Sequence, residues 1–324
     1  MVVANVVQAV TMALRQELKR DKNVVVMGED VGLNGGVFRA TDGLQKEFGA
    51  NRVIDTPLAE LGIVGTAIGM AVNGMRPVAE IQFSGFLYGA FDQLLSHAAR
   101  IRSRSRGRFS CPLVVRAPYG AGIRALELHC ESGEAIFSHV PGLKMVIPSN
   151  PYDTKGLLAA AIRDPDPVIF YEPMRMYRAI KQDIPEDDYI VPLGKANIIQ
   201  PGDDVTLIAW GAMIKTCQDA IAKLQGKYSV ELVDLRTINP YDAETIISSV
   251  KKTGRCVIAH EAIRTSGFAA ELIASINEKA LLSLHAPVVR VTGPDVPMPF
   301  AKLENYHIPD ANRIIKGIEK VMSF

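Results

Sequence analysis

The sequence predicts an α/β protein whose parallel sheets are covered by helices on both faces. Short apolar runs alternate with longer helical patterns, and this alternation occurs twice, on either side of a segment rich in proline and charge. The runs are apolar almost throughout, which is typical of strands buried on both faces of a parallel sheet. Together these observations favour two α/β domains joined by a linker.

The first domain is expected to span residues 1–185. Its strands are predicted over 23–28, 77–83, 112–116, 143–148 and 167–172. Helical patterns lie between them, near 5–20, 57–75, 85–101 and 153–163.

Residues 173–203 lack a sustained period and are interpreted as a surface linker that begins inside the first domain. A second domain is expected over 204–324. Its predicted strands are 204–211, 229–236, 255–261 and 287–293, and its helices lie near 213–225, 241–251, 267–282 and 311–322.

Composition excludes several classes of function. A net charge of +1 argues against a general binder of nucleic acid or of membrane surfaces. The longest uncharged run, 61–75, is shorter than the roughly 20 residues that a membrane span needs. The four cysteines are scattered, which indicates reduced thiols, and no secretion signal is evident, so a cytoplasmic location is expected.

Two arginine- and glycine-rich segments have competing interpretations. The stretch 28–43 lacks the spacing of known phosphate-binding loops and is interpreted as a turn, although Glu29 and Asp30 could line a cleft where a strand ends. Arginines occupy every second position over 100–108. They form either a solvated loop or a surface that attracts an anion or an acidic partner.

Glu60 is the least expected residue of "DTPLAELGIVG". A structural interpretation is available, because Asp55 or Thr56 can cap a helix and an acid in the first turn complements the helix dipole. The following turns are uncharged and expected to be buried, and their glycines would let another backbone approach closely. A buried carboxyl without a partner is costly. Glu60 is therefore expected either to meet a partner or to do chemistry.

Several segments resemble one family along nearly the whole chain. They are "GEDVGLNGGVFRATDGL", "DTPLAELGIVGTAIGMAVNGMRPVAEIQF", "VVRAPYGAG", "GLKMVIPSNPYDTKGLL", "DLRTINPYD" and "VTGPDVPMPFAK". The chain resembles the β subunits of thiamine-diphosphate-dependent 2-oxoacid dehydrogenases, the decarboxylase component of these complexes. The resemblance implies a pyrimidine-binding domain, then a transketolase-type C-terminal domain.

The resemblance also implies an α2β2 enzyme in which thiamine diphosphate is shared between subunits. The α subunit of the family carries the signature for Mg²⁺ and diphosphate, whereas this chain has only "PGDD" at 201–204. Half of the active site is therefore expected from a partner. A lipoyl acyltransferase core is the second implied partner, expected to dock on the C-terminal domain.

The family's site residues carry over to four positions. Glu60 matches the glutamate that hydrogen-bonds N1′ of the aminopyrimidine, Phe86 the aromatic that stacks on it, and Gln82 a neighbour of the same ring. His129 matches the histidine that assists acyl transfer to lipoyl, although Cys130 stands where the family usually has serine. Some relatives hold potassium, and the matching positions here are Leu113, Ala161, Asp164 and Asp166.

The implied reaction is oxidative decarboxylation of pyruvate with reductive acetylation of lipoyl groups. A branched-chain 2-oxo acid is the alternative substrate, and "GGVFRATDGL" and "VPMPFAK" favour pyruvate. A non-catalytic docking subunit is a different class, and retention of Glu60 and Phe86 argues against it. The missing diphosphate signature disfavours a self-sufficient transketolase-like synthase.

Overall fold

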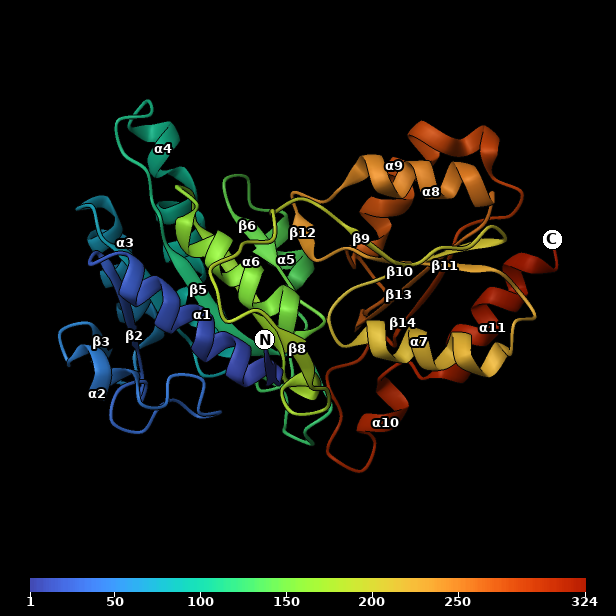
Figure 1. Ribbon diagram of the computed structural model, residues 1–324. Helices are drawn as coiled ribbons and strands as arrows, with labels where there is room; N and C mark the ends of the chain where they lie inside the picture. Colours follow the sequence, from blue (N-terminus) through green and yellow to red (C-terminus); the bar gives the residue numbers. More distant parts are fainter.

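The computed structural model describes all 324 residues and contains two principal sheets, each covered by helices (Figure 1). The N-terminal sheet has the strand order β12-β6-β7-β5-β4-β2-β3, and all its strands are parallel except β12. Its strands are β2 (Val24–Gly28), β3 (Val53–Asp55), β4 (Arg76–Glu80), β5 (Val114–Tyr119), β6 (Lys144–Val146), β7 (Val168–Pro173) and β12 (Thr237–Asn239). The predicted α/β fold class is confirmed.

Two sets of helices cover this sheet. On one face, α1 (Val6–Arg20) packs against α6 (Pro151–Arg163). An asparagine is the N-cap of both helices. Asn5 forms a capping box with Gln8 at the start of α1. The side chain of Asn150 accepts a hydrogen bond from the Asp153 amide, and Pro151 is the first residue of α6. The other face carries α3 (Glu60–Val72) and the 3₁₀ helix η1 (Ser84–Ala90). The remaining short helices are α2 (Leu44–Phe48), η2 (Gln93–His97), η3 (Ala98–Arg100), α4 (Ile101–Arg104) and α5 (Glu134–Ser138).

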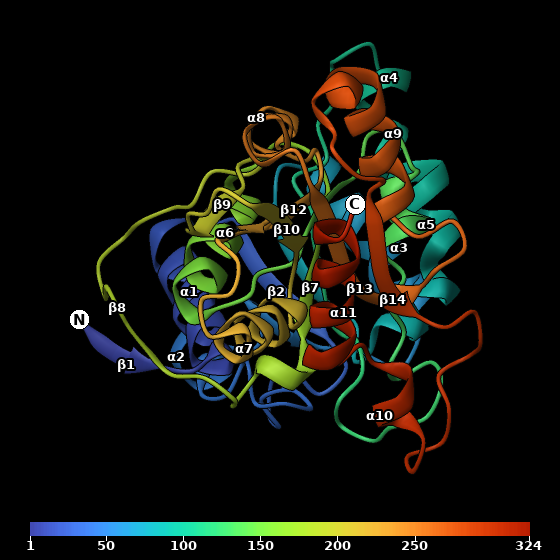
Figure 2. The same cartoon turned by 90° about the vertical axis from the view of Figure 1, so that its right-hand side faces the viewer.

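The C-terminal sheet has the order β14-β13-β10-β11-β9, with β9 antiparallel to its neighbour. Its strands are β9 (Asn197–Gln200), β10 (Val205–Ala209), β11 (Val230–Asp234), β13 (Cys256–Ile263) and β14 (Val289–Gly293). Helices α7 (Met213–Leu224) and α11 (Ala311–Met322) cover one face, and α8 (Ala243–Thr253) and α9 (Ala269–Ala280) cover the other (Figure 2). Two short helices complete the domain, η5 (Leu281–Ser283) and α10 (Glu304–His307).

The segment expected to be a plain surface linker is more structured than its composition suggested. It contains η4 (Met174–Met176), and β8 (Gln182–Ile184), which pairs with β1 (Val2–Ala4) at the N-terminus. It also supplies β9 to the second sheet. Met174, Met176 and Tyr177 are buried, so apolar side chains fasten this segment to the first domain.

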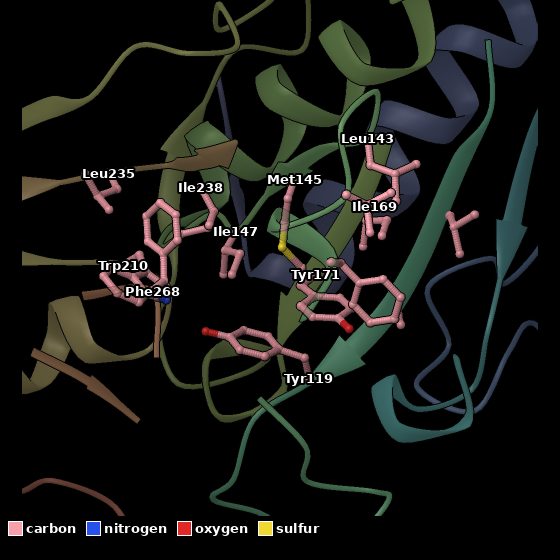
Figure 3. Close-up of a cluster of buried hydrophobic side chains, with 14 of the residues drawn as sticks. Tyr119, Leu143, Met145, Ile147, Ile169, Tyr171, Trp210, Leu235, Ile238 and Phe268 are labelled. Carbon is pink, nitrogen blue, oxygen red and sulfur yellow. The ribbon is translucent and has the colours of Figure 1, made fainter. Parts of the chain in front are cut away.

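The two domains share one hydrophobic core. Tyr119 and Tyr171 of the first sheet stack with ring centroids 5.1 Å apart, and Trp210 and Phe268 of the second domain belong to the same buried cluster (Figure 3). The domains therefore pack in part through a continuous apolar interior. No helix in the structure has both the length and the apolar character that a membrane crossing requires.

Candidate active site

The predicted site residues gather at one edge of the N-terminal sheet. Glu29 follows β2, Glu60 follows β3, Phe86 follows β4 and His129 follows β5. These four strands are parallel neighbours, so their carboxyl ends lie side by side. Ligands of open α/β sheets bind at this edge.

Glu60 is the first residue of α3 and lies in its first turn, as the sequence indicated. The residue before it, Ala59, gives no side-chain cap. Asp55 does not cap α3 as proposed, because its carboxylate accepts hydrogen bonds from the amides of Gly32 (2.6 Å) and Leu33 (3.1 Å). Glu60 is therefore left half-buried, at the helix terminus where backbone amides favour negative charge.

A second carboxylate lies close to Glu60. Burial raises the pKa of Glu29 above its usual value, and the negative charges of Asp30 and Glu60 raise it further. Glu29 is thus a carboxyl of this strand end in which holding a proton is favoured.

The expectation that α3 is buried is wrong for one of its faces. Ile63, Val64 and Ala67 are buried against the sheet, but Leu61 is 55% exposed. Gly69 has open space beside it, so no backbone of this chain approaches the glycine face. The reason is that this chain has no further layer outside α3.

Three aromatic rings meet at the same edge of the sheet. The ring of His129 lies 5.0 Å from that of Phe86 and 4.6 Å from that of Phe83, measured between centroids. Phe83 and Phe86 are themselves 5.7 Å apart, edge to face. The structure therefore brings together two predicted residues and adds Phe83, which the sequence reasoning missed. Its position at the end of the predicted strand 77–83 was the available signal.

The loop that carries His129 is anchored to η1. The Gly85 amide donates to the Leu128 carbonyl (3.0 Å), and the Ser84 hydroxyl donates to the Glu131 carbonyl (2.8 Å). A Cβ on Gly85 would lie only 2.3 Å from the Leu128 oxygen. Only glycine permits this approach, which sets the position of His129 relative to Phe86.

Cys130, the unusual neighbour of His129, points into the protein. It is buried, and its Sγ atom lies 3.6 Å from the Ala125 carbonyl oxygen. Burial raises the pKa of the thiol to about 12. Cys130 therefore remains a thiol at neutral pH and acts as a small buried side chain rather than as a nucleophile.

A cavity of about 740 Å³ lies between the domains, beside the His129 loop. Cys130, Glu131 and Ser132 line it from the first domain, and Glu261 and His307 from the second. Burial raises the pKa of Glu261 and lowers that of His307, so both groups are driven toward their neutral forms. The cavity thus offers two polar groups whose burial favours their neutral forms, close to the aromatic cluster.

The remaining predicted positions lie just after β4, just before β5, in α6 and in the loop between α6 and β7. Gln82 follows β4 and is half-buried. At the potassium positions, the Leu113 carbonyl accepts from the Val168 amide (2.9 Å) and the Ala161 carbonyl from the Asp164 amide (3.2 Å).

Side-chain cations hold the two aspartates of the potassium positions. Lys144 Nζ lies 2.7 Å from Oδ2 of Asp164, and Arg102 Nε lies 2.6 Å from Oδ1 of Asp166. No group of three or more acidic, cysteine or histidine side chains is arranged to hold a metal. Potassium binding here stays a prediction.

Family models match both halves of the chain. Residues 3–179 match the transketolase pyrimidine-binding domain, and residues 194–314 match the transketolase C-terminal domain. A solved structure described as a split-gene transketolase, an inactive β4 tetramer, superposes with a TM-score of 0.81 over 98% of both chains at 21% identity, which supports the fold. Fold and site thus define a transketolase-type subunit of the class that carries a pyrimidine-binding domain.

Curated relatives narrow this class. The pyruvate dehydrogenase E1 component subunit beta of Acholeplasma laidlawii is 51% identical over 322 residues, covering 99% of this chain and 98% of the relative. The protein of the same name from Bacillus subtilis (strain 168) is 51% identical over 319 residues, covering 98% of each. The chain belongs to the family of pyruvate dehydrogenase E1 component beta subunits. The predicted resemblance is confirmed, with pyruvate rather than a branched-chain 2-oxo acid as the family's substrate.

Proposed function

We propose that this chain provides the aminopyrimidine-binding half of a thiamine diphosphate site, and that an α subunit provides the half that holds the diphosphate and Mg²⁺. The observation that carries the proposal is the convergence of the Glu29–Glu60 carboxyls with the Phe83, Phe86 and His129 rings at one sheet edge. Aromatic rings suit a flat heteroaromatic ligand, and a carboxyl suits its ring nitrogens.

The residues present therefore fit the cofactor. Glu60 would hold a proton at N1′, Phe86 would lie against the ring, and Gln82 would border it. When bound, thiamine diphosphate supplies the electron sink for loss of CO₂ from a 2-oxo acid. His129, fixed on its loop beside the ring cluster, would position and protonate groups during acyl transfer to lipoyl.

The exposed face of α3 supports the need for a partner subunit. Leu58 and Leu61 are 69% and 55% exposed beside Glu60. A catalytic carboxyl in such a position becomes dry only when another chain covers it. The family resemblance implies that the covering chain is the α subunit of an α2β2 enzyme. We further infer that the C-terminal domain docks the lipoyl acyltransferase core.

The state of the cysteines bears on the cellular location of the protein. All four cysteines are free and buried, a state that a reducing compartment maintains. We therefore propose a cytoplasmic location. A separate proposal is that the Asp164 loop binds potassium as an optional ligand.

Reconstitution tests the proposal. The purified chain alone is expected to bind thiamine diphosphate weakly and to decarboxylate no 2-oxo acid, and the co-purified α partner is expected to restore turnover with pyruvate. A panel of 2-oxo acids separates pyruvate from branched-chain substrates. Full turnover by this chain alone would refute the division of the site, and an inactive but correctly assembled complex would favour a docking-only subunit.

A further inference from the structure

A second cavity, of about 420 Å³, lies on the C-terminal domain away from the sheet edge described above. It runs along the edge strand β14, between the loop after β13 and the helix α11. Five cationic side chains line it: Arg264, Arg290, Arg313, Lys316 and Lys320.

A single carboxylate in the lining offsets only part of this positive charge. Asp295 is the one carboxylate in the lining, and its oxygens accept from the amide and the hydroxyl of Thr265, each at 2.8 Å. Glu319, next to Lys320 in sequence, pairs instead with Lys227 (3.0 Å). The cavity therefore carries a strong positive charge.

The guanidinium groups are held in place by main-chain carbonyls. Arg290 donates to the Arg264 carbonyl (3.0 Å), and Arg264 donates to the Arg290 carbonyl (3.3 Å). Arg313 donates to the carbonyls of Thr292 and His307. A guanidinium has five N–H donors, so each arginine keeps donors free for a ligand while its orientation is fixed.

Crowding of like charges makes an anion favourable at this place. Arg290 is half-buried, and both burial and the charge of Arg264 lower its pKa. An anion between the two guanidinium groups would remove that repulsion and satisfy their free donors with charge-assisted hydrogen bonds.

We propose that this cavity binds a small molecule that carries two or more linked phosphate groups. A single phosphate would leave most of the positive charge uncompensated, whereas a di- or triphosphate matches it. The volume falls within the roughly 300–1,000 Å³ of small-molecule sites. Val289 and Val291 are the two hydrophobic residues of the lining, so the cavity suits a polar ligand rather than an acyl chain.

Calorimetric titration of the full-length chain with inorganic tripolyphosphate, in buffer free of Mg²⁺, tests the proposal. The informative variant is Lys316→Gln with Lys320→Gln, because both side chains are exposed on α11 and their loss leaves the fold intact. Arg264→Gln is the second variant. The control is Lys22→Gln with Lys46→Gln, which removes two exposed charges of the first domain.

The wild-type chain and the control are expected to bind tripolyphosphate with the same affinity. Each cavity variant is expected to bind it about tenfold or more weakly, because charge-assisted hydrogen bonds are lost. Inorganic phosphate should bind much more weakly than tripolyphosphate. Equal weakening in the cavity and control variants would overturn the proposal, as would absent binding by wild type. Tighter binding of oligoglutamate at the same residues would also overturn it, by indicating an acidic protein segment. The assay measures binding alone, so it is independent of turnover.

Discussion

Trp210 donates its indole Nε1–H to Oε1 of Glu134 over 3.3 Å, and this bond joins the C-terminal sheet to α5 of the first domain. The other oxygen of Glu134 is buried without a partner. Burial raises the pKa of Glu134 to about 8, and the charge of Glu261 adds to the effect. A carboxylic acid that is neutral at physiological pH therefore lies inside the domain contact.

This arrangement predicts that stability falls with rising pH. The unfolded chain loses the Glu134 proton near pH 4.5 and the folded chain near pH 8. The contribution of protonated Glu134 to the free energy of unfolding is therefore fully present below pH 4.5 and is lost by about pH 8. Glu134→Gln keeps an acceptor for Trp210 and cannot ionise. At pH 8.5 it is expected to be more stable than wild type by on the order of 2–4 kcal/mol, with little difference at pH 5.

Urea unfolding at a series of pH values measures this difference. Parallel curves for the two proteins between pH 5 and pH 8.5 would show that Glu134 does not change its proton on unfolding.

Glu60→Gln separates a structural from a catalytic role. Because an amide nearly matches the carboxyl in size, the variant is expected to assemble with its partner and melt close to wild type. Loss of a positioned acid–base group should slow C2 proton exchange of the bound cofactor by about 10²–10⁴-fold. Glu127→Gln, an exposed change on the His129 loop, is the matched control. A rate of C2 proton exchange within about threefold of the wild-type rate would contradict the catalytic role of Glu60.

His129→Ala should harm acyl transfer to lipoyl more than it harms the first decarboxylation. The ring lies beside Phe83 and Phe86, where it can meet an acyl acceptor, whereas the Glu60 carboxyl belongs to a different strand end. Turnover with an artificial electron acceptor is compared with acetylation of a lipoyl domain in the same preparation. Equal losses of activity in both assays would count against a specific role of His129 in acyl transfer.

Gly85→Ala should displace the His129 loop without unfolding the domain. The added Cβ would meet the Leu128 oxygen at 2.3 Å, and overpacking of this kind costs about 1–3 kcal/mol. Gly89→Ala, on the same helix η1 but with open space beside it, is the control. We expect faster proteolysis near residue 128 and lower activity in the first variant alone. Unchanged proteolysis would mean that the loop does not depend on this contact.

Most strands of both sheets could be predicted from sequence because each is a local apolar run. The strands β3, β9 and β12 were missed, since each has only three or four residues. The run 23–28 became β2 (Val24–Gly28), and 167–172 became β7 (Val168–Pro173). The helix predicted over 85–101 is broken into 3₁₀ and π segments. Gly85 and Gly89 weaken α-helical preference there, and the contact of Gly85 with Leu128 is a long-range one that no local pattern reveals.

Residues of the candidate site could be proposed from sequence where their side-chain chemistry stood out against their surroundings. Glu60 was conspicuous because it interrupts an apolar run, and His129 because of its family resemblance. Phe83 was not conspicuous, since an aromatic residue at the end of a strand is equally typical of a hydrophobic core. The exposure of α3 could not be predicted either, because the run 61–75 has the same composition whether it packs inside one chain or between two.

The three residues of β12 determine how this protein can be divided. Thr237 and Asn239 come from the second half of the sequence, yet they pair with Val146 and Met145 at the margin of the first sheet. A fragment that ends in the linker would therefore leave β6 as a bare strand edge, which is a template for aggregation. Exchange of catalytic halves between related enzymes, in the laboratory or in evolution, has to carry this strand across with the half that it completes.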